Sequence, residues 1–237
     1  GSNTTEAHPI VANRMIKAAR DKTATLSVID VRQTQLSKFG EQLIIPYEAN
    51  LLVLNMMAYV ILSEKLYNTE FIDSRCTGFE AYKDSILNDP YANPKYMKNV
   101  SGYEYLTEQI PTVARLYATK KSMFFWGLGI TEHLDGSYAV MAITHLSMMT
   151  GNIGKPGTGL MPLRGQNNVQ GACDTGCLPY YGPDYSVPDE IGLMTPQLID
   201  EMIAGKIKAM YVMGEDIAHI HPNQNKVHKG LANLELI

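Results

Sequence analysis

The sequence has 237 residues, of which 45% are hydrophobic and 19% charged, and this length and composition allow a sizeable core in one or two domains. A net charge of −4 without any block of Lys and Arg argues against a nucleic-acid partner. No apolar run reaches the roughly 18 residues that a membrane-spanning helix needs. Three cysteines are an odd number, which favours a reducing compartment over a disulfide framework, so we expect a cytoplasmic protein.

The first two thirds of the chain alternate between strand and helix patterns. Gly1-Ser2-Asn3 predicts a turn, and Pro9 suits the first turn of a helix because its missing N–H would be unpaired there. The patterns then predict a strand over 24–32, a strand over 41–47 and an apolar helix over 50–65. Two helical pieces over 68–87 follow, then a Pro- and Asn-rich loop over 88–99 and helical turns split by Pro111 over 103–120. A strand over 121–129 and an apolar helix over 135–149 complete this part.

The last third is less regular. About forty irregular residues follow Gly151, and a helix over 195–206 is predicted with Thr195 as its cap and Pro196 in its first turn. The stretch 207–216 predicts a strand that ends in a turn, and 234–237 predicts the start of another strand. Both ends of the chain interrupt a pattern, so we expect a fragment of a larger protein.

Alternating strands and helices predict an α/β fold with a parallel sheet. We expect a Rossmann-like sheet with helices on both faces over residues 1–165, with its N-terminal strand missing, and part of a second, truncated α/β domain over 166–237.

Glycine or acidic residues follow three of the predicted strands. The strand ends carry Asp30 with Arg32 just beyond, Gly127-Leu128-Gly129, and Gly214-Glu215-Asp216. Ligands of open α/β sheets bind outside the carboxyl ends of the strands, where glycine lets backbone N–H groups approach a phosphate. The pattern therefore predicts nucleotide binding, although neither G-x-G-x-x-G nor a P-loop sequence occurs.

The loop after Gly151 is long and rich in amides. Its stretch "MPLRGQNNVQGACDTG" (161–176) offers several Gln and Asn side chains, which suit a heterocycle with N–H and C=O groups, and Arg164, which suits a carboxylate or phosphate. A loop of this length in a compact protein is usually functional. Cys173 and Cys177 alone are too few ligands for a metal site, so we expect none in this chain.

Several segments together resemble the molybdopterin oxidoreductase family, and within it the catalytic α subunits of formate dehydrogenases. They are "HPIVANRMIKAAR", "WGLGITEHLDG", "LSMMTGNIGKPGTGLMPLRGQNNVQGACDTG" and "MGED". The resemblance covers almost the whole chain in consistent order, and "PLRGQNNVQGACD" is its most specific part. It implies two molybdopterin guanine dinucleotides with molybdenum or tungsten, oxidation of formate to carbon dioxide, and electron transfer to an iron–sulfur cluster.

The resemblance also assigns roles to residues. Arg164 is implied as the catalytic arginine beside the metal, where it would orient formate. The implied cofactor-binding residues are Ser2, Asn3, His8, Asp30, Arg32, Gly127, Gly129, Thr131, His133, Gln166, Asn167, Asn168, Gly214, Glu215 and Asp216.

The chain lacks the family's four cluster cysteines and its metal-ligating Cys or selenocysteine. We therefore expect a fragment that is inactive alone, holds no tightly bound cofactor, exposes apolar area and self-associates. Its expected partners are formate, the missing domains of the same polypeptide and electron-transfer subunits. Two alternatives stay open: a related oxidoreductase of the nitrate reductase type, and a non-catalytic α/β nucleotide-binding module.

Overall fold

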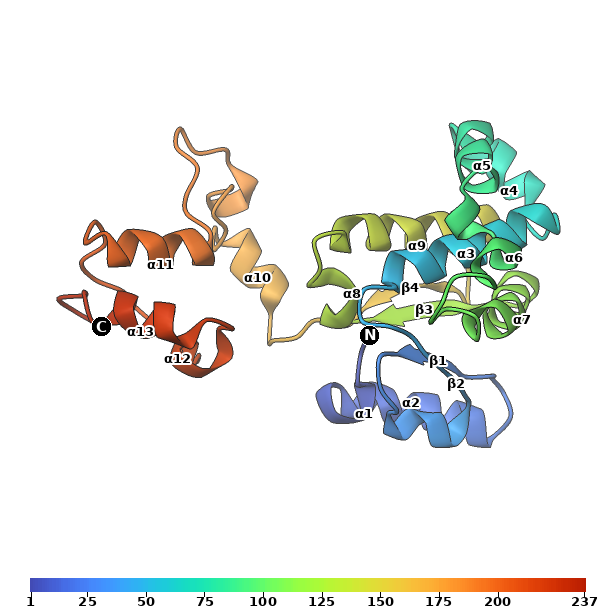
Figure 1. Ribbon diagram of the computed structural model, residues 1–237, viewed down its shortest axis with the longest axis horizontal. Coiled ribbons are helices and arrows are strands. Elements are labelled where there is room, and N and C mark those ends of the chain that lie inside the picture. Colours follow the sequence, from blue (N-terminus) through green and yellow to red (C-terminus); the bar gives the residue numbers. More distant parts are fainter. The chain divides into compact units, whose positions relative to one another are not determined.

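The computed structural model describes residues 1–237, which form two compact units, Gly1–Gly165 and Gln166–Ile237 (Figure 1). Both β-sheets lie in the first unit, and each contains two parallel strands. The second unit is helical, apart from one isolated β-bridge. No helix in the structure combines the length and the apolar character needed to cross a bilayer.

The first parallel pair joins β1 to β2, with Ser27 opposite Glu41 and Asp30 opposite Ile44. Pro9 is the first residue of α2, as predicted, and Arg20 at the end of that helix lies over the ring of Phe39, 5.0 Å from its centroid. The elements of this part are α1 (Thr4–Ala7), α2 (Pro9–Arg20), β1 (Ser27–Asp30), the 3-10 helix η1 (Gln35–Phe39) and β2 (Glu41–Ile44).

Helix α3 (Asn50–Ser63) is the centre of the core. It is apolar on nearly all sides, which is typical of a helix that is buried rather than amphipathic. Met56, Met57 and Ile61 are among its fully buried side chains. The helix packs against α7 (Leu106–Thr119) and α9 (Gly136–Thr150). The other helices of this layer are α4 (Thr69–Arg75), α5 (Phe79–Leu87), η2 (Pro90–Ala92), α6 (Pro94–Met97) and α7 (Leu106–Thr119).

The second parallel pair joins β3 (Met123–Trp126) to β4 (Gly159–Pro162). Between these strands the chain forms the short α8 (Leu128–Thr131) and the long α9 (Gly136–Thr150). Helix α9 ends at Gly151, which adopts the left-handed conformation that glycine tolerates without strain.

Gly1 lies between the two sheets. Its nitrogen donates to the carbonyl oxygen of Ile29 in β1 (2.9 Å), and its carbonyl oxygen accepts from the N–H of Gly129 just after β3 (3.1 Å). When Gly1 is counted as a position in the sheet, the order of neighbours is β2-β1-Gly1-β3-β4. If these five positions are numbered along the chain, with Gly1 as position 1 and β1 as position 2, the order is 3-2-1-4-5. This is the order of the Rossmann fold.

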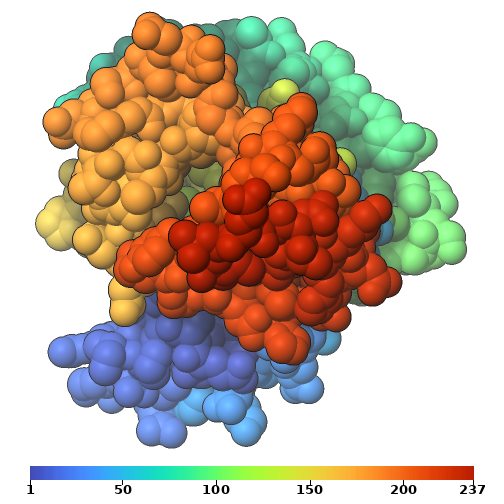
Figure 2. Space-filling view, turned by 90° about the vertical axis from the view of Figure 1, so that its left-hand side faces the viewer, coloured from blue at the N-terminus to red at the C-terminus, as the bar shows by residue number.

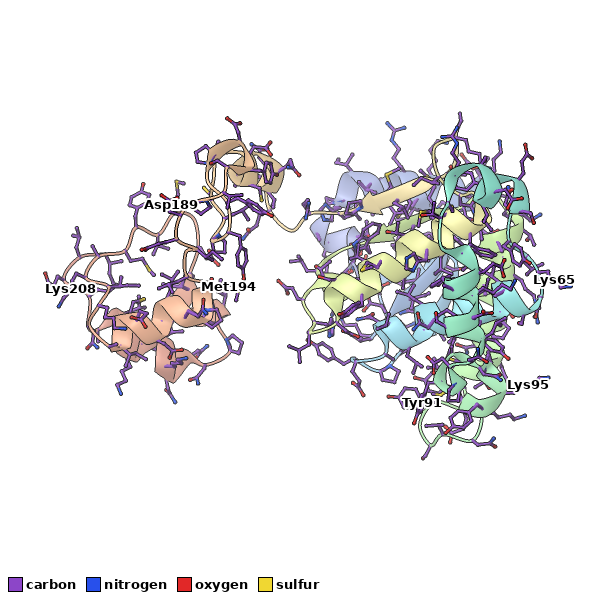
Figure 3. The ribbon with its side chains drawn as sticks, turned by 90° about the horizontal axis from the view of Figure 1, so that it is seen from above. Lys65, Tyr91, Lys95, Asp189, Met194 and Lys208 are labelled. Carbon is purple, nitrogen blue, oxygen red and sulfur yellow. The ribbon has the colours of Figure 1, made fainter.

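In the second unit, α11 (Thr195–Ile203) packs against α13 (Gln224–Leu231) through apolar side chains. Ile199 and Met202 of α11 and Val227 of α13 are buried, and a parallel bridge joins Ala209 to Leu236. Figure 2 shows the surface of this unit in orange and red, and Figure 3 labels Asp189 and Met194 in the irregular segment before α11. Its elements are α10 (Val169–Asp174), η3 (Pro183–Tyr185), α11 (Thr195–Ile203), α12 (Ile217–Ile220) and α13 (Gln224–Leu231).

The second unit also exposes many large apolar side chains. Tyr211 and Met213 are 87% and 80% exposed. The others in this unit that are more than half exposed are Val187, Ile191, Ile220, Leu236 and Ile237. This matches the expected apolar exposure, whereas self-association stays a prediction.

The structure confirms the predicted α/β class and most of the predicted helices. Two predictions in the helical layer were wrong. The loop over 88–99 contains η2 and α6, because Asp89 and Asn93 cap these turns with side-chain oxygens. Pro111 does not split its helix: α7 continues through it, since buried Leu106, Ile110 and Ala114 hold both sides of the proline against the core.

Three predictions after Gly151 were also wrong. Residues 159–162 form β4 instead of irregular chain, because their backbone pairs with β3. Residues 207–216 contain only the bridge at Ala209, since no neighbouring strand extends the pairing. Thr195 is the first helical residue of α11 and not its cap; the Gln197 side chain accepts from the N–H of Met194, which is the capping residue.

Asn152 ties the start of β3 to α7 and α9, and its removal should destabilise the first unit. Its amide donates to the carbonyl of Tyr117 (2.9 Å) and accepts from the N–H of Ser122 (3.1 Å). Replacing Asn152 with Ala leaves these buried groups unpaired, so we expect a loss of about 1–3 kcal/mol in the free energy of unfolding, measured by urea denaturation. The exposed Asn99→Ala control should change it by less than about 0.5 kcal/mol. Equal stability of the two variants would refute this role.

Candidate functional site

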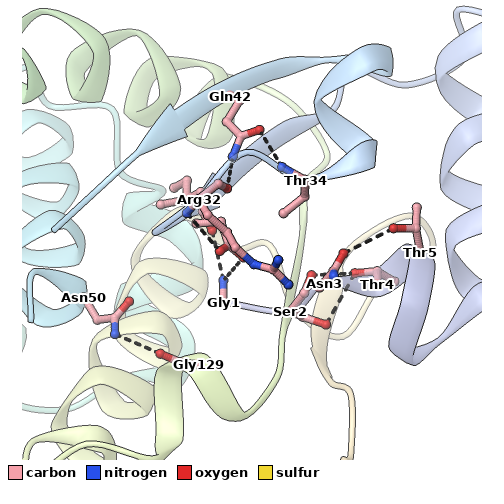
Figure 4. A network of polar contacts seen from close by, with 12 residues as sticks. Gly1, Ser2, Asn3, Thr4, Thr5, Arg32, Thr34, Gln42, Asn50 and Gly129 are labelled. Carbon is pink, nitrogen blue, oxygen red and sulfur yellow. Dashed lines mark hydrogen bonds and ion pairs between the residues drawn. The ribbon is translucent and has the colours of Figure 1, made fainter. Parts of the chain in front are cut away.

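The candidate site lies at the carboxyl edge of the strands in the first unit. In the order β2-β1-Gly1-β3-β4, the strand order reverses between Gly1 and β3. Ligands of open α/β sheets bind in the crevice at such a reversal. Asp30 ends β1, Ser2 follows Gly1, and Gly127 follows β3, so the fold brings together residues that are far apart in the sequence. Figure 4 shows Gly1 and Ser2 beside Arg32 and Gly129 at this edge.

Glycines allow the backbones to approach closely at this edge. A Cβ atom on Gly129 would lie 2.7 Å from the carbonyl oxygen of Gly1, and one on Gly127 would lie 3.2 Å from the Cβ of Ser2. The first distance is too short for any side chain, so only glycine fits beside Gly1 at this point.

Several backbone N–H groups at this edge are free to bind a ligand. Those of Ser2, Asn3 and Leu128 make no hydrogen bond in the structure, while Asn3 and Gly127 precede the helices α1 and α8. Unpaired N–H groups at helix starts beside close-packed glycine suit the oxygens of a phosphate.

The loop after β1 presents a buried carboxylate. Asp30 is 8% exposed; its Oδ2 lies 3.5 Å from the nitrogen of Gly1, and its Oδ1 lies 3.4 Å from the N–H of Arg32. The Gln42 side chain donates to the carbonyl of Arg32 (2.6 Å) and accepts from the N–H of Thr34 (3.2 Å), which fixes the loop. The hydroxyl of Thr34 is buried without a partner. A carboxylate and a free hydroxyl suit the hydroxyl groups of a ribose.

The turn after β3 is held by two side chains. The amide of Asn50 donates to the carbonyl oxygen of Gly129 (2.9 Å), and Nε2 of His133 lies 3.1 Å from the same oxygen. The ring of Tyr47 packs against the imidazole of His133, with the centroids 4.6 Å apart. Thr131 ends α8 and lines a depression of about 270 Å³ together with Gly136, Ser137 and Val140.

Arg164 follows β4 at the same carboxyl edge. The N–H of Leu163 donates to the carbonyl of Trp126 (2.7 Å), so the chain is still paired with the end of β3 one residue before Arg164. Arg164 is exposed and belongs to none of the ion pairs in the structure. Its guanidinium is therefore available to an anionic ligand.

The remaining predicted residues lie elsewhere. His8 connects α1 to α2 without a side-chain hydrogen bond. Gln166 and Asn167 are exposed at the start of the second unit, where Asn168 adopts a left-handed conformation and caps α10 through Gly171. These three amides belong to the second unit.

The Gly214 turn also belongs to the second unit. Gly214 has a positive φ of 68°, and Oδ2 of Asp216 lies 2.7 Å from Nδ1 of His219. The hydrogen bond from His219 holds the pKa of the Asp216 carboxyl below its usual range. Glu215 is exposed between them. This turn thus presents two exposed carboxylates next to a glycine with positive φ.

Three contributing residues were missed in the sequence: Asn50, Tyr47 and Gln42. Asn50 had a detectable signal, since it is the amide that opens a long apolar helix, and a polar side chain there needs a partner. The sequence around Tyr47 and Gln42 carries no such signal. The partners of Gln42 depend on the pairing of β1 with β2, and the partner of Tyr47 depends on the path of the chain just before α3. The structure contains no group of three or more His, Cys, Asp and Glu side chains that could hold a metal ion.

A family model described as molybdopterin oxidoreductase matches residues 1–237. Formate dehydrogenase H of Escherichia coli is 35% identical, and the alignment covers 100% of this chain and 35% of the relative. F420-dependent formate dehydrogenase subunit alpha of Methanocaldococcus jannaschii is 38% identical, with 100% and 37% covered. A Methanococcus maripaludis protein, F420-dependent formate dehydrogenase 1 subunit alpha, is 36% identical, with 100% and 37% covered. The chain spans about a third of the length of these relatives, and the matches confirm the predicted resemblance.

The close approach of Gly129 to Gly1 should make Gly129→Ala destabilising. The new Cβ would meet backbone atoms of Gly1, which cannot move aside as a side chain can. We expect a loss of about 1–3 kcal/mol in the free energy of unfolding, although alanine favours helix formation in α8. Urea denaturation measures this loss.

The matched control for that variant is Gly165→Ala, whose Cβ would meet only the tip of the Leu128 side chain, 2.8 Å away. Since that tip can rotate, the control should cost less than about 1 kcal/mol. If the Gly129→Ala protein were as stable as the control, the backbones of Gly1 and Gly129 could move apart at little cost, and the prediction would be wrong.

Proposed function

Because the chain belongs to the molybdopterin oxidoreductase family, we propose that it forms the cofactor-binding part of a formate dehydrogenase α subunit. The reaction proposed for the whole protein is the oxidation of formate to carbon dioxide, with the electrons passing to an iron–sulfur cluster. Support comes from the names of the relatives, which are formate dehydrogenases from bacteria and archaea that match the chain over its full length.

Family membership implies a molybdopterin cofactor, and the first unit fits a dinucleotide form of it. The free N–H groups of Ser2, Asn3 and Leu128 would hold phosphate oxygens, and buried Asp30 would accept hydrogen bonds from a ribose or guanine. Arg32 is exposed beside Asp30 and would contribute positive charge. When bound, the molybdopterin with its molybdenum or tungsten supplies the redox chemistry.

We assign one dinucleotide to each unit. The unit 1–165 would hold the first through the strand ends, with Gly127, Gly129, Thr131 and His133 along the cofactor. The unit 166–237 would hold the second through Gln166, Asn167, Asn168, Gly214, Glu215 and Asp216. His8, which lies between α1 and α2, is also proposed as a cofactor-binding residue.

The observation that carries the substrate proposal is the position of Arg164. It directly follows the last residue paired to β3, at the carboxyl edge of the sheet, and its guanidinium has no carboxylate partner. A planar guanidinium can donate two parallel hydrogen bonds to a small carboxylate such as formate, and this would orient the C–H bond. Arg164 would hold the carboxylate of the substrate in a fixed orientation, and the bound cofactor would supply the redox chemistry.

Replacing Arg164 with Ala in the full-length enzyme should lower kcat/KM for formate by about a hundredfold or more, because one strong donor pair is lost. Arg164→Lys keeps the charge without the fork, and we expect it to recover only part of the activity. Steady-state formate oxidation with an artificial electron acceptor measures both variants.

Arg75→Ala is the matched control, because Arg75 is exposed at the end of α4 and away from the strand ends. It should leave kcat/KM unchanged. An Arg164→Ala enzyme with wild-type kcat/KM would remove Arg164 from the site, and a wild-type enzyme that reduces nitrate instead of oxidising formate would replace the proposed substrate.

Replacing Asp30 with Asn should lower the content of guanine dinucleotide in the full-length enzyme. The variant keeps the shape of the side chain and removes its charge. Hydrogen bonds from a ribose or guanine to this side chain are then weaker, and we expect the affinity for the dinucleotide to fall by about tenfold. GMP released by acid hydrolysis, per mole of protein, measures the content. Asp73→Asn is the control, since Asp73 is exposed on α4, and equal GMP in both variants would exclude Asp30 from the cofactor site.

A further inference from the structure

The carbonyl oxygen of Gly129 accepts two side-chain hydrogen bonds. One comes from the amide of Asn50 (2.9 Å), and the other partner is Nε2 of His133 (3.1 Å). A carbonyl oxygen can only accept, so Nε2 must carry the hydrogen in this contact. In a neutral imidazole the second nitrogen, Nδ1, is then an acceptor.

Nδ1 of His133 makes no hydrogen bond in the structure. The ring is nevertheless held on two sides, by the Gly129 carbonyl and by the ring of Tyr47, whose plane is tilted by 49°. Tyr47 precedes Asn50 by three residues, so a single segment entering α3 supplies both the contact to Gly129 and the contact to the imidazole.

Asn50 is suited to set this arrangement because it is itself fixed. It is 6% exposed, it begins the buried helix α3, and its partner lies 79 residues further along the chain (Figure 4). A side chain on a packed helix holds its partner more precisely than one on a loop does.

We propose that Asn50 is a positioning residue that, through the Gly129 carbonyl, holds His133 as the Nε2–H tautomer, and that Nδ1 of His133 accepts a hydrogen bond from an N–H group of the cofactor's heterocycle. The second half of this inference rests on the proposed function, because it places the cofactor along Gly127–His133. The first half concerns only the chain itself. Pterin and guanine both carry such N–H groups, and the experiment separates them.

The test uses the chain labelled with ¹⁵N-histidine and observed by long-range ¹H–¹⁵N correlation at about pH 8.5, where histidines are neutral. His133→Gln identifies the resonances of His133 among the six histidines. We expect the Nε2–H form, with exchange of that proton with water about tenfold slower than for the ring N–H of His228, which is exposed and whose side chain makes no hydrogen bond. The Nδ1–H form would overturn the tautomer assignment whatever the function of the protein.

Two variants of α3 isolate the part played by Asn50. In Asn50→Leu the Nε2–H proton should exchange about tenfold faster, because the Gly129 carbonyl is no longer held. Asn55→Leu is the matched control, since Asn55 lies on the same helix and its side chain makes no hydrogen bond, and the exchange rate should stay as in the wild type. Equal rates in Asn50→Leu and the wild type would overturn the positioning role.

GMP and neopterin, added separately at millimolar concentration, test the contact at Nδ1. A shift of the His133 Nδ1 resonance with one probe supports the contact and identifies guanine or pterin as its source. No shift with either probe would overturn the Nδ1 contact. The tautomer of His133 and the formate activity of the full-length enzyme are measured independently, so that outcome would change neither.

Discussion

The backbone contact between Gly1 and Gly129 is the constraint on which the candidate site depends. A Cβ on Gly129 would lie 2.7 Å from the carbonyl oxygen of Gly1, so the N–H of Gly129 can reach that oxygen only because the residue has no side chain. The same Gly1 pairs with Ile29, and it therefore joins the two parallel strand pairs. This one contact brings the ends of β1 and β3 to the same edge of the sheet, close to the unpaired N–H groups of Ser2 and Asn3 and to the buried Asp30.

Helix α3 gives this edge its rigidity. Its apolar surface is buried against α7 and α9, which favours one position of the helix because core packing tolerates little displacement. Asn50, the first residue of the helix, donates to the Gly129 carbonyl, and Tyr47 just before the helix packs on the imidazole of His133. The position of the helix therefore determines the position of this edge. The turn after β3 is thus positioned from the hydrophobic core, although the turn itself is short.

The polar stretch over 161–176 divides into parts with different roles. Arg164 belongs to the first unit and extends from β4, whereas the amides that follow belong to the second unit. Asn168 uses its side chain to cap α10, and Gln170 donates to Asp174 and to the hydroxyl of Tyr185. Only Gln166 and Asn167 keep amides that are exposed and without a partner, so fewer groups are available to a ligand than the composition of the stretch indicates.

The sequence by itself determined the elements that local patterns control, the residues at the strand ends and the family. Long apolar runs predicted α3 and α9, and Pro9 and Gly151 predicted a helix start and a helix end, because these effects act within a few residues of the chain. Only the tertiary structure decided which segments pair. Gly159–Pro162 has no strand pattern and becomes β4 beside β3, whereas the strand-like residues 207–213 form a single bridge. Pairing depends on a partner distant in sequence, as the contact of Asn50 with Gly129 does, and no local pattern contains that information.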